Sequence, residues 1–184
     1  MKGHTQSSRH NFVTGLCLHG LAAFLSVGIR WRRKAGAIMA HQPPLKYVFY
    51  FGATPEKVWE GFVSRESNRA IYSGAEFQVD PKPGGSLAWT GPGPDGKPMT
   101  YVRGKVLRFD PPKVLQHTFA MAKSNKESRV SIELVRETEA TQVTVTHNEW
   151  ADDDPTYAAC ADGWPRILSR LKTLLETGKT FKPH

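Results

Sequence analysis

The 184-residue chain is long enough for one ordinary domain plus a tail, and its 39% hydrophobic and 23% charged residues are typical of a globular protein rather than a disordered or membrane-spanning one. Residues 1–38 hold six of the 25 basic residues and none of the 17 acidic ones, so most of the net charge of +8 lies there; the nearly neutral remainder argues against a nucleic-acid-binding domain. Two cysteines without metal-ligand spacing exclude a disulfide framework, and we predict no metal, no cofactor and a cytoplasmic location.

Residues 12–29 form a mostly apolar stretch between basic flanks, with the larger cluster, Arg30 to Lys34, after it. A stretch of this length could be a single membrane anchor with the domain on the cytoplasmic side. Its lack of acidic residues also fits an organelle-targeting segment. Met39 resembles a second start, so the interpretation we favour places residues 1–38 before the native start. We therefore predict a basic N-terminal extension, disordered or non-native, over residues 1–44, and no membrane contact unless the segment is a real anchor.

The first predicted elements are one strand and two short helices. Residues 47–51 are rich in aromatic and β-branched side chains, which favours a strand. Thr54 and Pro55 follow as a helix N-cap and first helical residue. A second short helix is predicted from about Ser67 to Tyr72, ending at Gly74.

Glycine- and proline-rich turns then separate a series of predicted strands. The turns lie at residues 81–85, 91–96 and 110–112, and the strands at 77–79, 87–89, 99–109, 114–121, 129–135 and 141–148. Alternation in the last three strands places their apolar residues and two histidines on one face. The residues of this face are Leu115, His117, Phe119, Met121, Val130, Ile132, Leu134, Val143, Val145 and His147. Symmetric turns would place Phe119, Val130 and His147 in one row, and His117, Ile132 and Val145 in the next.

A long amphipathic helix is predicted to end the domain. Its apolar side chains recur at helical spacing and are Trp164, Ile167, Leu168, Leu171, Leu174 and Leu175. Asp154-Pro155 is the predicted start, Gly178 the predicted end, and Arg170 is expected on the outer, polar side. The sequence therefore predicts an α+β fold in which a curved antiparallel sheet wraps around this helix.

Several segments, in this order, resemble a known family. They are Ala53-Thr54-Pro55-Glu56-Lys57-Val58-Trp59, Lys82-Pro83-Gly84-Gly85, Asp110-Pro111-Pro112, His117-Thr118-Phe119, Thr144-Val145-Thr146-His147, Gly163-Trp164-Pro165 and Leu174-Leu175-Glu176-Thr177-Gly178. Together they are similar to bacterial relatives of the C-terminal domain of the activator of Hsp90 ATPase, within the START-like or Bet v 1-like superfamily. The resemblance implies a helix-grip domain over residues 45–179, followed by a short tail at 180–184. It also implies a cavity between sheet and helix, but no shared catalytic motif.

The candidate site consists of the aromatic residues and histidines expected to face that cavity. They are Trp59, Phe62, Tyr72, Phe77, Trp89, Tyr101, His117, Phe119, His147, Trp150, Trp164 and Leu168. Aromatic side chains would stack on a flat apolar or amphipathic ligand, and a neutral imidazole could orient it or transfer a proton. Each histidine could equally be a buried, hydrogen-bonded core residue, and Cys160 is expected to be a packing thiol.

Three functions are consistent with these residues. The leading hypothesis is a protein that binds a small apolar or amphipathic molecule. The alternatives are a cyclase- or aromatase-type enzyme that uses a histidine in the same cavity, and a module that binds a chaperone of the Hsp90 type. No nucleophile–base arrangement, phosphate loop or dinucleotide fingerprint is present, so no catalytic residue is assigned.

Overall fold

The computed structural model describes residues 42–122, 124 and 126–182, so the predictions for residues 1–38 lie outside the described residues. Seven strands and three helices follow one another as β1(Leu45–Phe51), α1(Pro55–Val63), α2(Arg65–Ile71), β2(Glu76–Val79), β3(Ser86–Pro92), β4(Pro98–Asp110), β5(Val114–Met121), β6(Ser128–Arg136), β7(Thr141–Asn148) and α3(Tyr157–Thr177). Within these ranges, no helix combines the length and the apolar character needed to cross a membrane.

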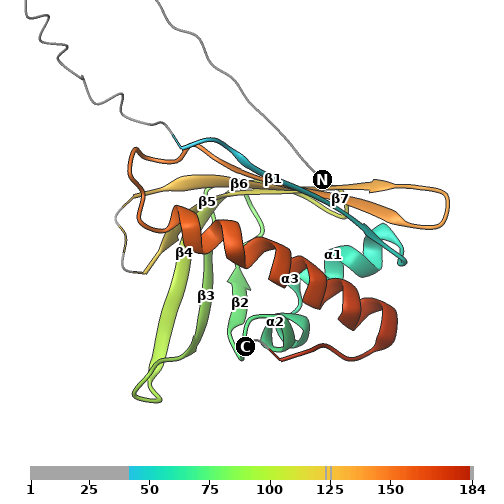
Figure 1. Ribbon diagram of the computed structural model, residues 1–184, viewed down its shortest axis with the longest axis horizontal. Helices are drawn as coiled ribbons and strands as arrows, with labels where there is room; N and C mark the ends of the chain where they lie inside the picture. Colours follow the sequence, from blue (N-terminus) through green and yellow to red (C-terminus); the bar gives the residue numbers. More distant parts are fainter. Residues whose placement is uncertain (1–41, 123, 125, 183–184) are drawn as a thin grey trace, which may run out of the picture. The chain divides into compact units, whose positions relative to one another are not determined.

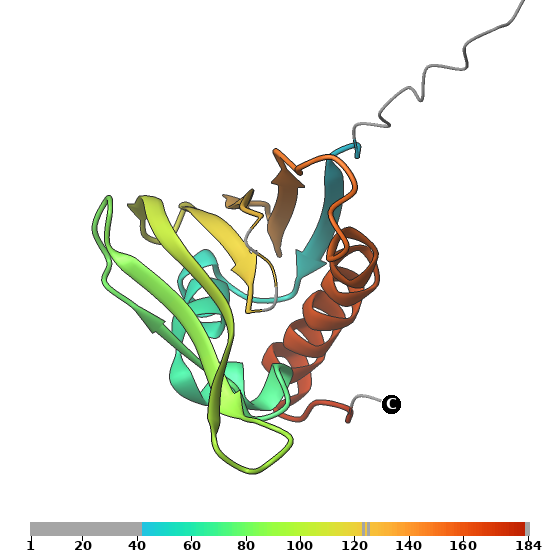
Figure 2. The ribbon, with the colours of Figure 1, turned by 90° about the vertical axis from the view of Figure 1, so that its left-hand side faces the viewer.

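The strands form one antiparallel sheet in the order β1-β7-β6-β5-β4-β3-β2. Figure 1 shows α3 running beneath the sheet, with α1 and α2 near the C-terminal end of α3. In Figure 2 the sheet curves from β1, beside α3, round to β3 and β4 on the opposite side. This is the predicted helix-grip arrangement, and it is confirmed.

The local signals at the helix ends explain most of these boundaries. Thr54 caps α1 through its hydroxyl, which accepts a hydrogen bond from the Lys57 amide at 3.3 Å. Gly178 ends α3 with a positive φ of 75°, as its position predicts. The predicted starts of two helices, Ser67 for α2 and Asp154-Pro155 for α3, are wrong by two or three residues. Ser64 caps α2, which therefore begins at Arg65. Asp154 binds the amide and hydroxyl of Thr156, and α3 begins only at Tyr157.

Pro165 lies inside α3, and its missing N–H is compensated from the sheet. A proline cannot donate to the carbonyl four residues earlier, which is that of Ala161. The Tyr47 hydroxyl, from β1, donates to this carbonyl at 2.9 Å. The helix therefore continues through Pro165, and the same hydrogen bond attaches it to the edge strand of the sheet.

We expect Tyr47→Phe to lower the free energy of unfolding by about 1 kcal/mol, because the Ala161 carbonyl loses the hydrogen bond that replaces the one Pro165 cannot donate. Urea unfolding followed by tryptophan fluorescence measures this change. Tyr50→Phe is the matched control, since Tyr50 is exposed on the outer face of the same strand. Equal losses in the two variants would contradict the role given to the Tyr47 hydroxyl.

The core lies between the concave face of the sheet and α3. All the inward-facing residues predicted on β6 and β7 are buried, as are Leu168 and Leu171 of α3. Gly61 allows α1 to approach α3 closely, because a Cβ at this position would lie 2.8 Å from Leu171 Cδ1. α1 and α3 therefore pack closely together at Leu171, which is fully buried.

The predicted position of Arg170 is wrong. Its side chain is buried, with 6% exposure, and does not lie on the outer side of α3. The guanidinium donates to the carbonyls of Ala70 and Ile71 at the end of α2. These carbonyls have no partner within α2, so Arg170 satisfies them and fixes α2 against α3.

The predicted pairing of β5 with β6 is also wrong, by two residues. His117 lies opposite Val130, and Val130 lies opposite His147. The two histidines are therefore in one row across the sheet, with Val130 between them, and Phe119 lies opposite Ser128. The predicted pairing of β6 with β7 is confirmed.

Candidate functional site

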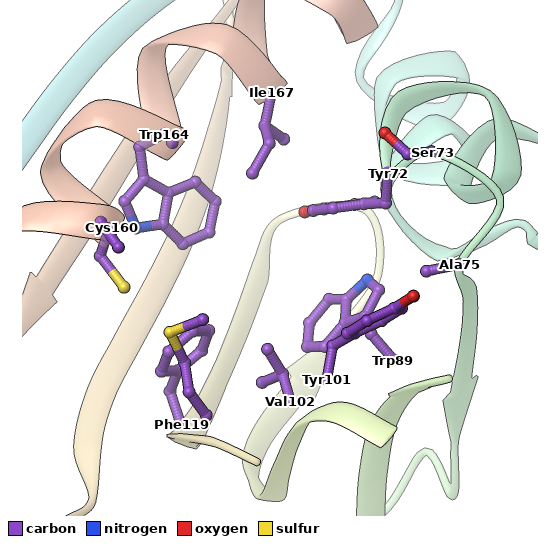
Figure 3. A pocket seen from close by; sticks show the side chains of 13 residues that line it. Tyr72, Ser73, Ala75, Trp89, Tyr101, Val102, Phe119, Cys160, Trp164 and Ile167 are labelled. Carbon is purple, nitrogen blue, oxygen red and sulfur yellow. The ribbon is translucent and has the colours of Figure 1, made fainter. Parts of the chain in front are cut away.

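A cavity of about 460 Å³ lies between α3 and the curved half of the sheet. Its walls come from the end of α2, from β3, β4 and β5, and from α3, as Figure 3 shows. The lining residues are Tyr72, Ser73, Ala75, Trp89, Tyr101, Val102, Phe119, Met121, Ala159, Cys160, Gly163, Trp164 and Ile167. No carboxylate or imidazole is among them. The size is within the range of small-molecule sites, which is roughly 300–1,000 Å³.

Five of the twelve sequence-predicted residues line this cavity, and seven do not. The five are Tyr72, Trp89, Tyr101, Phe119 and Trp164. The other seven belong to the surrounding core and are Trp59, Phe62, Phe77, His117, His147, Trp150 and Leu168. Several of these support the walls directly. The rings of Phe77 and Trp89 are 4.6 Å apart, and those of His147 and Phe119 are 4.8 Å apart.

His147 is a positioning residue behind the cavity wall. The indole N–H of Trp164 can only donate, and it donates to His147 Nδ1 at 3.1 Å. His147 Nε2 therefore carries the proton and donates to Ser128 Oγ at 2.7 Å. Burial, with a smaller contribution from His117, lowers the pKa of His147 to about 3. The ring is neutral and fully hydrogen-bonded, and it holds Trp164 in the wall.

His117 is buried in the neighbouring part of the core. Its Nδ1 lies 2.8 Å from the Thr118 carbonyl, so Nδ1 carries the proton and donates. Its Nε2 is buried and has no hydrogen-bond partner among the described residues. Burial lowers the pKa of His117 to about 4, despite the opposing effect of the Thr118 hydrogen bond. Neither histidine reaches the cavity lining, so this geometry gives no support to histidine proton transfer on a molecule bound there.

The other polar groups of the wall aromatics are also occupied by the protein. Trp89 Nε1 donates to Asn68 Oδ1 at 2.9 Å. Asn68 is fully buried, and its amide donates to the carbonyls of Phe62 and Ser64 at the α1–α2 corner. The Tyr101 hydroxyl donates to the Pro92 carbonyl. These bonds leave the faces of the rings, and not their polar tips, for contact with a ligand.

Tyr72 is the exception among the aromatic residues of the cavity. Figure 3 shows its hydroxyl pointing across the cavity, whereas that of Tyr101 points toward Ala75. Within the described part of the chain, the Tyr72 hydroxyl makes no hydrogen bond. Burial raises its pKa, so it stays a neutral donor at ordinary pH. Burial likewise raises the pKa of Cys160 to about 12, which keeps the thiol protonated and unreactive.

Of the α3 side of the cavity, the sequence alone predicted only Trp164. The other lining residues of this helix are Ala159, Cys160, Gly163 and Ile167, and Cys160, Gly163 and Ile167 recur at helical spacing with Trp164. A glycine inside a predicted amphipathic helix was the available signal, because such a glycine destabilises the helix by about 1 kcal/mol relative to alanine. Arg170 and Asn68 carried no comparable local signal.

Comparison with solved structures gives several neighbours with the same fold. PFC0360w of Plasmodium falciparum, described as an HSP90 activator, is 17% identical, with a TM-score of 0.60 over 73% of this chain and 97% of its own. CalU16 of Micromonospora echinospora is 18% identical, with a TM-score of 0.58 over 73% and 77%. ChR145 of Cytophaga hutchinsonii is 24% identical, with a TM-score of 0.61 over 75% and 97%. These similarities show a common fold.

Comparison at the sequence level is more decisive. No curated protein sequence matches the chain. The family model described as "Activator of Hsp90 ATPase homolog 1-like protein" matches residues 52–176. That range begins just after β1 and ends one residue before the end of α3, so it includes every wall of the cavity. The chain therefore belongs to the activator of Hsp90 ATPase homolog 1-like family.

Proposed function

We propose that the protein binds a small, largely apolar molecule in the cavity between α3 and the sheet. The cavity of about 460 Å³ carries this proposal. Its aromatic faces offer stacking surfaces, and nearly all its polar tips are already hydrogen-bonded to the protein. Burial of an apolar molecule there gains about 25 cal/mol for each Å² of apolar surface removed from water.

Gly163 supports the proposal that the cavity is kept open for a ligand. It lies in the interior of α3, where glycine is unfavourable, and it lines the cavity. A Cβ added at Gly163 would have no neighbouring atom within 4 Å, so packing does not require a glycine there. Gly61, by contrast, is needed for contact with Leu171. We infer that Gly163 keeps room for a bound molecule.

The chemistry of the lining favours binding over catalysis. A proton-transfer enzyme needs a group whose pKa lies near the working pH. The ionisable side chains of the cavity are Tyr72, Tyr101 and Cys160. Burial raises the pKa of Tyr72 and that of Cys160, away from neutrality. The family resemblance brings no catalytic residue to this lining either.

The test of this function is to place a larger side chain in the cavity at Gly163 and to measure probe binding. Wild-type protein is expected to bind the neutral fluorescent probe phenylnaphthylamine saturably, with one site per chain. Gly163→Leu should weaken this binding by at least about tenfold, because the new side chain occupies the ligand space, while the protein stays folded. Fluorescence titration measures the affinity and circular dichroism the folding.

Ala158→Leu is the control, because it adds a leucine to the same helix at an exposed residue that does not line the cavity. It should leave the affinity unchanged. Absence of saturable binding to the wild type, or equal affinity in wild type and Gly163→Leu, would refute cavity binding.

One observation favours a second candidate, the binding of a protein partner through the outer face of the sheet. Val48, Tyr50 and Val135 are exposed large hydrophobic residues on that face. Tyr50 and Val135 both lie opposite Gln142, from either side, so their side chains share one row. A neighbour of the same fold is described as an HSP90 activator, which makes a chaperone the partner class to consider. A protein that binds no probe in its cavity would favour this candidate.

A further inference from the structure

A second hollow adjoins the cavity on the side of the chain's C-terminal residues. Its volume is about 530 Å³, and it lies between the end of α2, the middle of α3 and the segment after α3. Tyr72, Ser73, Gly163 and Ile167 line both the cavity and this hollow. The two spaces are therefore neighbours, and the unpartnered Tyr72 hydroxyl belongs to the residues that they share.

The second hollow differs from the cavity in its charge. Arg166, Arg170 and Lys182 line it, and no acidic residue does. Arg166 forms an exposed ion pair with Asp162 at 3.1 Å, which is worth little in water. Lys182 is exposed and lies in the segment after α3. We call this space the basic hollow.

Arg170 gives the strongest indication that the basic hollow binds an anion. Its guanidinium is buried, and within the described residues no carboxylate contacts it. Two of its nitrogens bind carbonyls of α2, but Nε is buried without a partner. A buried cation without a counter-charge is costly, and a buried donor without an acceptor adds to that cost. An anion in the basic hollow would supply a counter-charge close to this guanidinium.

We propose that the molecule bound by this protein is amphipathic, with an apolar body and one anionic group. The apolar body occupies the aromatic cavity, and the anionic group lies in the basic hollow near Arg166, Arg170 and Lys182. The Tyr72 hydroxyl, a neutral donor at the junction, donates a hydrogen bond to the ligand as it passes from one space to the other. This inference rests on the proposed binding function and specifies its ligand class.

Two fluorescent probes that differ by one charge test this inference. Phenylnaphthylamine is neutral, and anilinonaphthalene sulfonate carries the same ring system with one added sulfonate. Wild-type protein is expected to bind the anionic probe at least about tenfold more tightly, because a charge-assisted hydrogen bond contributes that much affinity. Raising the salt concentration tenfold should lower the affinity for the anionic probe and leave the affinity for the neutral probe unchanged.

The double variant Arg166→Gln/Lys182→Gln tests the basic hollow with two exposed substitutions that leave the core intact. It should lower the preference for the anionic probe by about fivefold without changing the affinity for the neutral one. The control Lys46→Gln/Lys105→Gln removes the same net charge from exposed residues outside both spaces, and should keep the wild-type preference.

The outcomes separate this inference from the binding function. Saturable binding of the neutral probe, blocked by Gly163→Leu, together with equal or weaker binding of the anionic probe, would overturn the ligand class alone. The same conclusion follows if both double variants lower the anionic preference equally. Failure of both probes to bind would overturn the binding function, and this inference with it.

Discussion

Replacement of Leu171 by alanine is expected to lower the free energy of unfolding by about 2–5 kcal/mol, the range for large-to-small changes in a core. Leu171 is fully buried in the middle of α3. At Gly61 the backbone of α1 approaches the side chain closely, since an added Cβ would be 2.8 Å from Leu171 Cδ1, so one wall of its site is helix backbone. The site cannot collapse easily onto the space left behind. Urea unfolding at constant pH measures the loss.

Leu107→Ala is the matched control for this prediction. Leu107 lies on β4 with 38% exposure, so the same atoms are removed from a position that is already partly in water. We expect this variant to lose much less stability, about 1 kcal/mol or below. A loss within about 0.5 kcal/mol for Leu171→Ala would mean that the sheet does not grip α3 at this point.

The second large effect is a loss of stability in mild acid, caused by the two buried histidines. An ordinary histidine has a pKa of 6.5, whereas folding lowers the pKa of His117 to about 4 and that of His147 to about 3. Between these values the unfolded chain binds more protons than the folded one. The stability contributed by the neutral rings is therefore complete above pH 6.5 and is lost as the pH falls below it.

A fall from about pH 7.5 to about pH 5.5 is expected to lower the free energy of unfolding by about 1.4 kcal/mol for each histidine, or by about 3 kcal/mol for the pair. Two carboxylates, Glu176 and Glu56, do not contribute in this interval. The pKa of Glu176 is lowered, chiefly by its hydrogen bond from Lys172, and that of Glu56 is lowered by a backbone hydrogen bond, so both remain ionised. Urea unfolding at the two pH values gives the difference directly.

His117→Phe should remove about half of this pH dependence, because one titrating ring remains. Its stability at pH 7.5 is a separate quantity, which includes the loss of the hydrogen bond to the Thr118 carbonyl. The pH dependence therefore tests protonation apart from packing. A variant with the full wild-type slope would show that His117 does not exclude the proton in the folded state.

The sequence by itself determined the order and type of the elements. Strand alternation, the Thr54-Pro55 helix start and the apolar spacing from Trp164 to Leu175 are local signals, and each of these elements is present. They are reliable because a side chain's direction follows from the period of its own helix or strand. The same alternation placed both histidines on the inner face of the sheet, where they are buried.

Only the tertiary structure decided how these elements fit together. A shift of two residues between β5 and β6 keeps every side chain on its face, so alternation could not exclude the actual pairing of His117 with Val130. Arg170 is buried because α2 ends against it, and a charged residue carries no sequence signal for a carbonyl partner about 100 residues away. The cavity is the space that sheet curvature and α3 leave between them. Its lining therefore depends on long-range packing, which separates Trp164 in the wall from Leu168 in the core.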